Sequence, residues 1–228
     1  MRRPPTPRPD LEWIVPGGVS PRDPARQDGA MRALDIVLSL AALVFLAPLM
    51  VLIAMAVALS DGGPALFVHR RIGRGGRTFG CLKFRSMRPD AEARLRALLA
   101  EDPVARVEWA RDQKLTRDPR ITPLGRFLRR SSLDELPQFL NVLQGEMSLV
   151  GPRPIVETEA GRYGRRLEHY CRLRPGITGL WQVSGRSAAT YRRRVACDSL
   201  YARRRSLTLN ARILVSTVPA VLKARGAV

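Results

Sequence analysis

Residues 36–59 read IVLSLAALVFLAPLMVLIAMAVAL, and this segment fixes how the rest of the 228-residue chain is organised. It contains no charged residue, and its only polar side chain is that of Ser39. As a straight helix of ~1.5 Å per residue it would be about 36 Å long, enough to cross a bilayer with some tilt. A helix buried in a soluble core normally carries a polar face, which this segment lacks. We therefore expect residues 31–59 to form a membrane-inserted element.

Pro48 lies at the middle of this segment. Proline has no N–H to donate to the carbonyl of Val44, and its ring crowds that carbonyl, so we expect a kink there. The basic flanks are nearly balanced, with three arginines in residues 16–35 and four in residues 60–79. The positive-inside rule then assigns both ends to the cytoplasmic side. A re-entrant helix–break–helix satisfies both observations, and a proline-kinked helix that spans the membrane is the alternative.

The whole chain is strongly basic. It has 39 Lys and Arg against 20 Asp and Glu, a formal net charge of +19, and only three of the basic residues are lysines. Such a surplus attracts polyanions, namely nucleic acid, anionic lipid or polyphosphate substrates. The guanidinium fork matches phosphate oxygens, although genomic base composition also favours arginine. The three cysteines have neither disulfide nor zinc spacing, which indicates a reducing compartment and no structural metal.

The remaining sequence divides into a tail and one domain. Residues 1–30 are rich in Pro, Arg, Asp and Gly and are expected to be a disordered tail rather than a signal peptide. Residues 60–228 are long enough for one compact cytosolic domain. We expect this domain to be mainly α-helical with a small β-hairpin and with amphipathic helices at the membrane interface.

Local patterns predict the elements of this domain. Gly73–Gly76 separates two short apolar runs, which is typical of a hairpin. Thr122 followed by Pro123 has the pattern of a helix start, and Gly145 that of a helix end. The predicted elements are a hairpin over 65–69 and 78–85, helices over 90–101, 122–130, 136–144, 188–204 and 207–224, and a loop over 174–185. The last helix has an apolar face that fits a membrane surface or packing on the domain.

Asp134 and Glu135 lie in the densest cluster of candidate functional residues, Arg129–Gln138. Adjacent carboxylates at a helix start, flanked by arginines, can bind Mg²⁺ and phosphate together, and a carboxylate can also act as a nucleophile. The structural alternative is helix capping, because Ser132 and Glu135 have capping-box spacing. Capping does not account for the flanking arginines.

Two further segments present candidate phosphate-binding cations. Pro152 and Pro154 stiffen the backbone on both sides of Arg153, which suits a phosphate clamp; a plain loop with a solvated arginine is the alternative. Lys83 and Arg85 lie at the end of a predicted strand, where spacing i and i+2 places both side chains on one face.

On these residues the chain resembles the monotopic phosphoglycosyl transferases, the bacterial sugar transferases that use polyprenyl phosphate. The resemblance extends from about Met31 to the C-terminus and includes the short, stand-alone members of exopolysaccharide pathways that start on galactose or glucose. It rests on several stretches in the same order: Lys83–Met87, Asp118–Thr122, Arg129–Gln138, Asn141–Pro154 and Arg174–Arg186.

The resemblance implies an activity and a location. Such enzymes transfer a sugar 1-phosphate from a UDP-sugar to undecaprenyl phosphate with Mg²⁺ and release UMP, at the first membrane step of surface glycan synthesis. The resemblance implies that Asp134 and Glu135 form the catalytic dyad, that Asp134 binds the metal and forms a covalent phosphosugar intermediate, and that Arg129 and Arg153 contact phosphate. It also implies a re-entrant helix broken at Pro48, in the bacterial inner membrane, with the catalytic domain on the cytoplasmic face.

The chain departs from the family pattern at four positions. A Gln usual in the hairpin is His69 here, and aromatic or acidic positions usual near the C-terminus are Arg205, Thr208 and Asn210. The dyad is intact, so activity is still expected, while sugar choice or C-terminal membrane contact could differ. The sequence does not name the sugar or the pathway, and it leaves the oligomeric state open, a homodimer included.

Two other classes of function are the alternatives. A membrane-tethered nucleic-acid-binding protein fits the net charge, but the chain lacks a recognition-helix motif and a ladder of stacking aromatics, so we expect no nucleic-acid partner. An inactive scaffold for polysaccharide assembly is the second alternative, and the intact dyad argues against it.

Overall fold

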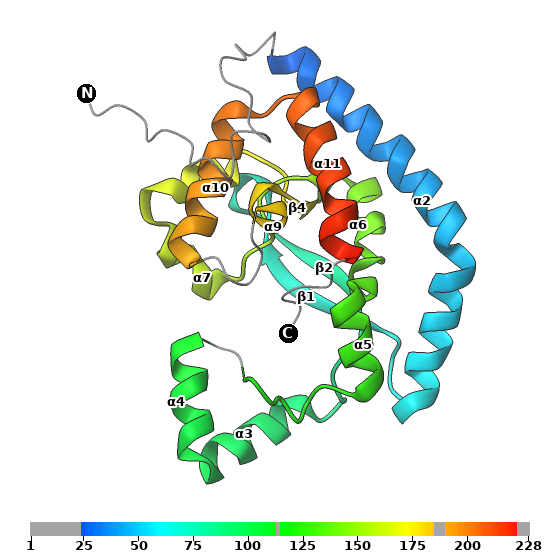
Figure 1. Cartoon of the computed structure of the whole chain (residues 1–228), viewed down its shortest axis with the longest axis vertical. Coiled ribbons are helices and arrows are strands. Elements are labelled where there is room, and N and C mark those ends of the chain that lie inside the picture. Colours follow the sequence, from blue (N-terminus) through cyan, green and yellow to red (C-terminus); the bar gives the residue numbers. More distant parts are fainter. Residues whose placement is uncertain (1–23, 113–114, 185–189, 223–228) are drawn as a thin grey trace.

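The computed structural model describes residues 24–112, 115–184 and 190–222, and helices predominate in these ranges (Figure 1). Two small sheets lie among them: an antiparallel hairpin of β1 (Leu66–Ile72) and β2 (Thr78–Phe84), and a parallel pair of β3 (Ser148–Val150) and β4 (Gly176–Thr178). The predicted class, mainly α with a small hairpin, is confirmed. The helices are α2 (Pro24–Asp61), α3 (Ala91–Glu101), α4 (Pro103–Asp112), α5 (Pro123–Ser131), α6 (Gln138–Gln144), α7 (Glu157–Tyr163), α8 (Leu167–Cys171), α9 (Leu180–Val183), α10 (Tyr191–Arg204) and α11 (Leu207–Leu222), with 3-10 turns η1 (Arg74–Gly76), η2 (Leu133–Glu135) and η3 (Gly164–Arg166).

The five helices predicted for the domain are present, and two predictions of irregular structure are corrected. Residues 24–30, predicted as part of a disordered tail, are helical, because Asp28 pairs with Arg205 and Met31 is buried against the domain. The predicted loop over 174–185 contains β4 and α9, because β4 gains its backbone partner β3 only in the folded chain. Residues 1–23, 185–189 and 223–228, which include most of the predicted tail and one end of each of the last two predicted helices, lie outside the described residues.

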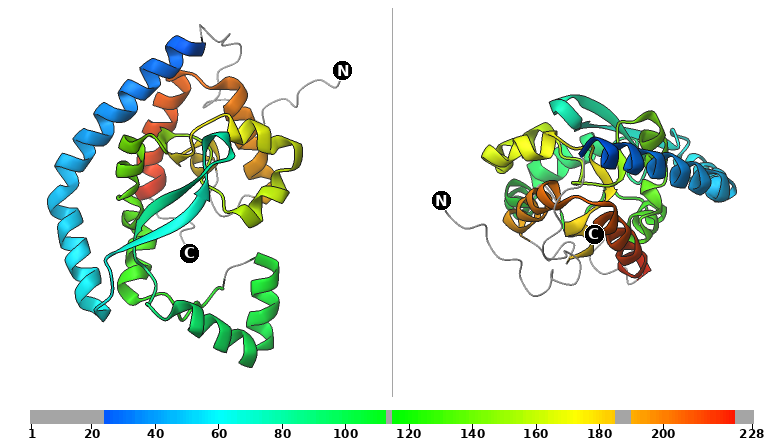
Figure 2. Two further views of the ribbon diagram at one scale, coloured as in Figure 1. Left: turned by 180° about the vertical axis from the view of Figure 1, so that it is seen from behind. Right: turned by 90° about the horizontal axis from the view of Figure 1, so that it is seen from above.

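α2 is one continuous helix of 38 residues, about 57 Å long at ~1.5 Å per residue. It bows around one side of the domain (Figures 1 and 2) and passes through Pro48 without interruption. The predicted break at Pro48 is therefore wrong. A proline removes one helical hydrogen bond, and a long helix accommodates that loss by bending while its other bonds persist. By length and composition, Asp28–Asp61 is sufficient to cross a membrane.

The N-terminal end of α2 is fastened to the domain by polar contacts. The Arg32 guanidinium donates to the carbonyl oxygens of Val142 at 2.6 Å and Leu143 at 3.0 Å, two carbonyls in the last turn of α6. The Asp35 carboxylate accepts a hydrogen bond from the backbone N–H of Leu149 at 3.0 Å. These contacts satisfy backbone groups that the elements themselves leave free.

The C-terminal end of α2 is fastened to the same domain by apolar contacts. Ile53 and Val57 are buried in a cluster with Phe84 at the end of β2 and Leu128 of α5. Between the two fastened ends most of the apolar side chains are exposed, as for Phe45 with 83% of its surface accessible. α2 therefore exposes apolar side chains along most of its length, while a few residues at each end contact the domain.

Two hydrophobic clusters place the strands that carry the candidate site. The larger cluster joins β2, α6, β3, α10 and α11 around Val142, Met147 and Ile213, all fully buried. The smaller joins the end of β1 to α7, α8 and α10 around Tyr163 and Tyr170. By contrast, α3 and α4 extend away from the rest of the domain as an arm, and α3 buries none of its residues (Figure 1).

Asn141 joins α6 to the hairpin from a fully buried position. Its Oδ1 accepts a hydrogen bond from the backbone N–H of Leu82 at 2.9 Å, and its Nδ2 donates to the carbonyl of Gly80 at 2.8 Å. The side-chain amide thus pairs with the backbone of β2 in the way a further strand would.

The variant Asn141→Ala is expected to lose about 2–4 kcal/mol of unfolding free energy, because a buried side chain is lost and a partly buried N–H and C=O are left without these partners. Chemical denaturation of the purified protein measures this loss. Leu140→Ala, one position away on the same helix and 37% exposed, is the matched control and should lose less than about 1 kcal/mol. Equal losses in the two variants would show that the amide contacts do not stabilise the fold.

Candidate active site

Asp134 and Glu135 lie in η2, the short turn between α5 and α6. α5 ends at Ser131, and the next residue, Ser132, has a φ of 60° in the left-handed region that turns the chain toward β2. The Ser132 side chain makes no capping hydrogen bond, and the Glu135 carboxylate binds Lys83 instead. The capping alternative for these residues is therefore wrong, because tertiary contacts use both positions differently.

Two cations from separate segments meet at Glu135. Lys83 Nζ, from β2, donates to Glu135 Oε1 at 2.6 Å and lies 3.7 Å from Asp134 Oδ2. Arg153 Nη1, from the loop after β3, lies 3.8 Å from the same Glu135 oxygen. Burial alone would raise the pKa of Glu135, but Lys83 and Arg153 hold it below its ordinary value. Glu135 is thus ionised and orients both cations.

Asp134 has a different environment from its neighbour. Its side chain is buried, and none of the described residues donates a hydrogen bond to its carboxylate. Burial raises the pKa of Asp134, the adjacent Glu135 adds to the rise, and Lys83 partly offsets it. A desolvated carboxylate without hydrogen bonds keeps its oxygen atoms available for a metal ion or for attack on an electrophile.

Arg129 reaches this site from α5. The helix approaches the end of the hairpin so closely that a Cβ at Gly125 would lie 2.0 Å from the carbonyl oxygen of Ser86. That approach lets Arg129 Nε donate to Ser86 Oγ at 2.8 Å. Burial lowers the pKa of the half-buried Arg129, and the charge of Asp134 partly offsets that shift, so Arg129 lies within electrostatic reach of the dyad.

Arg85, in contrast, is not brought to the dyad. Its guanidinium donates to Asp61 Oδ2 at 2.7 Å and, through Nε, to the carbonyl of Pro64 at 2.6 Å, and the side chain is buried. It ties the end of α2 to the hairpin. The prediction that Lys83 and Arg85 share a face is wrong, because β2 ends at Phe84 and the alternation of a strand does not continue to Arg85.

Arg71 is a site residue that the sequence analysis missed. Its Nη1 donates to the carbonyl of Pro154 at 3.2 Å, and its Nη2 lies 3.0 Å from His69 Nδ1. Burial and the nearby cations lower the pKa of His69 to about 4, so the neutral ring accepts this bond. Strand alternation could have indicated Arg71 as a site residue, because His69 and Arg71 lie on the same face of the hairpin as Cys81 and Lys83.

Arg71, Lys83, Glu135 and Arg153 line one small open pocket, whereas Asp134 and Arg129 lie beside it and are not among its lining residues. Arg153 stands at its rim with its backbone fixed on both sides: the carbonyl of Pro152 accepts from Gly176 N at 2.8 Å, and that of Pro154 from Arg71. The lining residues are Arg71, Cys81, Lys83, Glu135, Gln138, Arg153, Pro154, Gly176 and Ile177.

Beyond Arg153 the structure places further donors that have no acceptor. The guanidinium carbons of Arg153 and Arg194 lie 5.9 Å and 5.3 Å from the centre of a Trp181 ring. Arg194 Nη1 pairs with Glu159 at 3.3 Å, but its Nε and Nη2, like Trp181 Nε1, are buried with no hydrogen-bond partner among the described residues. Buried donors without partners are uncommon, and these lie around Trp181, the ring that Arg153 also faces.

The residues at the dyad fit a magnesium ion that is held mainly by other ligands. Within the described ranges no group of three or more His, Cys, Asp or Glu side chains could hold a metal. Mg²⁺ is usually bound by one or two protein carboxylates, with water and substrate phosphates completing its octahedron. The free carboxylate of Asp134 matches that mode.

Sequence comparison places this geometry among known proteins. The undecaprenyl-phosphate galactose phosphotransferase of Salmonella typhimurium is 50% identical over 196 residues, which are 86% of this chain and 41% of that protein. The exopolysaccharide production protein ExoY of Sinorhizobium fredii is 47% identical over 195 residues, 86% of each chain. A UDP-glucose:undecaprenyl-phosphate glucose-1-phosphate transferase of Caulobacter vibrioides is 38% identical over 226 residues, 95% of this chain and 78% of that protein.

The chain thus spans about two fifths of the length of the Salmonella protein but most of the length of ExoY. The bacterial sugar transferase family matches residues 26–224, a range that includes nearly all of α2, the dyad, the Arg153 loop and all of α11. A match of this extent, together with these identities, shows that the chain belongs to the bacterial sugar transferase family.

Proposed function

We propose that this chain transfers a hexose 1-phosphate from a UDP-sugar to undecaprenyl phosphate. The observation that carries the proposal is the buried, unbonded carboxylate of Asp134 beside Lys83, Arg129 and Arg153. Three cations around one carboxylate suit a phosphorylated substrate better than a neutral one. The Salmonella relative is named for galactose and the Caulobacter relative for glucose, so we propose one of these two sugars.

The reaction proceeds in two displacements at one phosphorus atom. In the first, an Asp134 oxygen attacks the β-phosphorus of the UDP-sugar, the bond from that phosphorus to the bridging oxygen breaks, and UMP leaves with the electron pair. The product is a sugar phosphate joined to Asp134 as an acyl phosphate. In the second, an oxygen of undecaprenyl phosphate attacks the same phosphorus, and the Asp134 carboxylate departs unchanged.

The surrounding residues stabilise charge, position one another and donate hydrogen bonds to the substrate. Lys83 and Arg153 stabilise negative charge on the phosphoryl oxygens, and Glu135 holds both in place while leaving Asp134 free. Arg194 and Trp181 supply the unpartnered donors for more distant oxygen atoms of the substrate. Mg²⁺, held by Asp134 and the diphosphate, would supply further charge neutralisation.

UMP release from a panel of UDP-sugars, with purified protein and undecaprenyl phosphate, tests this function. We expect sustained release with UDP-galactose or UDP-glucose, and about one UMP per protein when the lipid phosphate is omitted, since the covalent intermediate then accumulates. Absence of UMP from every UDP-sugar would contradict the proposal, and salt-sensitive DNA binding in the same preparation would favour the nucleic-acid alternative.

The two neighbours of Asp134 set its pKa in opposite directions, which gives a pH prediction. Asp134 must be ionised to attack, so kcat/KM declines as pH falls through its raised pKa. Lys83→Gln removes a charge that lowers this pKa and should move the acidic limb of the profile to higher pH. Glu135→Gln removes a charge that raises it and should move the limb to lower pH. Shifts in the same direction, measured in pH profiles of UMP release, would contradict this assignment.

We also propose that α2 enters the bacterial inner membrane from the cytoplasmic face and returns to it. Arg32 and Asp35 at one end, and Val57 and Asp61 at the other, all contact the same domain. A spanning helix would have to pull one of these ends away, whereas insertion of the exposed middle keeps both. The balanced basic flanks assign both ends to the cytoplasm.

Single cysteines at residues 29 and 77 test this topology in a variant that lacks Cys81, Cys171 and Cys197. Gly29 has open space around it, and Arg77 is exposed in the hairpin connection. Both sites should resist a membrane-impermeant thiol reagent in intact cells and react after lysis. Labelling of the residue 29 site from the periplasm, with residue 77 protected, would show that α2 spans.

A further inference from the structure

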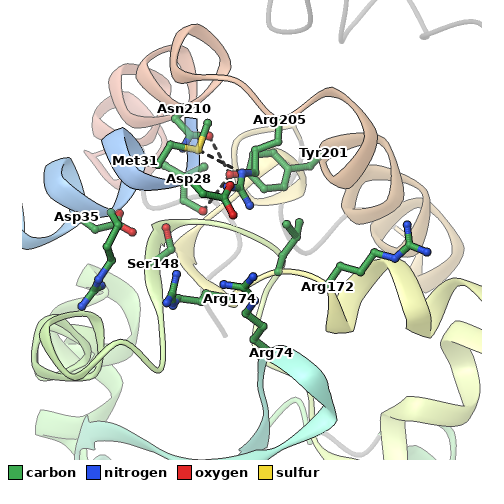
Figure 3. A pocket seen from close by; sticks show the side chains of 13 residues that line it. Asp28, Met31, Asp35, Arg74, Ser148, Arg172, Arg174, Tyr201, Arg205 and Asn210 are labelled. Atoms are coloured by element: carbon green, nitrogen blue, oxygen red, sulfur yellow. Dashed lines mark hydrogen bonds and ion pairs between the residues drawn. The ribbon is translucent and has the colours of Figure 1, made fainter. Parts of the chain in front are cut away.

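A second pocket lies at the N-terminal end of α2 and shares no lining residue with the dyad pocket (Figure 3). It forms where α2, the hairpin turn η1, the segment after α8, and the α10–α11 connection meet. Five arginines line it, against the two carboxylates of Asp28 and Asp35. The arginines are Arg32, Arg74, Arg172, Arg174 and Arg205. The pocket therefore carries a surplus of three positive charges.

Some of these charged side chains already pair with other groups of the protein. Arg205 pairs with Asp28, which removes one carboxylate from the balance. Arg172, directly after α8, pairs with the exposed Glu168 of that short helix. The Asp35 carboxylate accepts a backbone hydrogen bond from Leu149, as described above.

Arg74 and Arg174 form no ion pair with a carboxylate of the described residues, although the charge of Asp35 acts on Arg174. Arg174 Nε donates to the carbonyl of Gly145 at 2.8 Å, while its two Nη atoms have no hydrogen-bond partner within the described part of the chain. Arg74 has none there either, and its side chain rises from the hairpin toward Arg174 (Figure 3). Burial lowers the pKa of Arg174, the charges of Arg74 and Arg32 lower it further, and the charge of Asp35 partly offsets them.

Unpaired guanidinium groups that face one space repel each other unless an anion lies between them. A phosphate group is the anion that guanidinium recognises best, because two N–H groups match two phosphoryl oxygens. Arg205 and Asn210 also line this pocket, and neither adds negative charge to it.

We propose that Arg74 and Arg174, with Arg32 behind them, bind a phosphate group at the membrane surface. The site is placed at the membrane surface because Asp28, Arg32 and Asp35 directly precede the apolar segment that begins at Ile36. The placement of this site at the membrane surface depends on the proposed insertion of α2, whereas the binding of a phosphate group does not. An anionic phospholipid headgroup and a soluble phosphate share this chemistry, and the experiment separates them.

Binding of two probes to the full-length protein in detergent tests the site. The probes are short-chain phosphatidylglycerol and inorganic phosphate, each titrated by calorimetry against wild type, Arg74→Gln and Arg77→Gln. Arg77 lies in the same hairpin connection, is exposed and does not line the pocket, so its variant controls for the loss of one positive charge. We expect phosphatidylglycerol to bind Arg74→Gln about tenfold more weakly than wild type, and Arg77→Gln with unchanged affinity.

Each outcome decides the question. An Arg74-dependent affinity for phosphatidylglycerol assigns the headgroup as ligand, and one for inorganic phosphate alone assigns a soluble phosphate. Equal affinity of wild type and Arg74→Gln for both probes, or equal weakening by Arg77→Gln, overturns the site. The affinity of the dyad pocket for phosphate should not depend on Arg74, which does not line that pocket. Failure of the proposed transfer reaction would appear separately, as absence of UMP release.

Discussion

Asp134→Asn is expected to lower kcat by a factor on the order of 10⁴ or more, to the background of the assay. The amide is nearly isosteric with the carboxylate but is neutral and a poor nucleophile, so no acyl phosphate can form. The fold should be retained, because no described residue donates a hydrogen bond to the Asp134 carboxylate and a buried neutral amide avoids the desolvation of a charge.

Two measurements separate the loss of chemistry from a loss of structure. UMP release reports turnover, and retention of radioactive sugar on the denatured protein reports the covalent intermediate, which only the wild type should show. Asp90→Asn, at an exposed carboxylate that pairs with Arg94, is the matched control and should keep wild-type activity. Substantial turnover by a folded Asp134→Asn protein would remove Asp134 from the role of nucleophile.

Arg153→Ala should lower kcat/KM by about 10²–10³-fold, the range typical when one preorganised donor to a developing charge is removed. The arginine is preorganised because hydrogen bonds fix the carbonyls of Pro152 and Pro154 on either side of it. Its guanidinium is also held 3.8 Å from Glu135 and against Trp181. Little freedom is therefore lost when it binds a phosphate.

Arg153→Lys distinguishes a phosphate clamp from a simple need for positive charge. A lysine supplies the charge but not the planar fork, so we expect only partial recovery relative to Arg153→Ala. Arg165→Ala, at an exposed arginine in η3, removes the same charge away from the dyad pocket and should leave kcat/KM unchanged. Full activity of Arg153→Ala would show that the Pro-Arg-Pro segment serves only to hold the backbone.

Local patterns were sufficient for much of the fold. The hairpin around Gly73–Gly76, the start of α5 at Thr122, and the end of α6 at Gly145 all appear as predicted. Each depends on a few adjacent residues: turn glycines, a capping hydroxyl before a proline, and a glycine whose φ of 85° favours the end of a helix. Such short-range chemistry is visible in the sequence.

The parallel pair β3–β4 and the continuous course of α2 could not be predicted in this way. β4 follows β3 by more than twenty residues, and both are only three residues long, so no periodic pattern marks them. Pro48 indicated a break, but the contacts at both ends of α2 belong to distant segments that the local pattern does not contain.

For the candidate site too, local motifs identified some residues, and tertiary packing decided the others. Asp134, Glu135 and Arg153 could be found as candidates from clustering and from resemblance, because their chemistry is concentrated in short motifs. Which cations join them depended on tertiary packing: the hairpin presents Lys83 and Arg71 on one face, while the end of β2 at Phe84 diverts Arg85 to Asp61. A motif can specify reactive groups locally, but the distance between charges on separate segments is fixed only when the core packs those segments together.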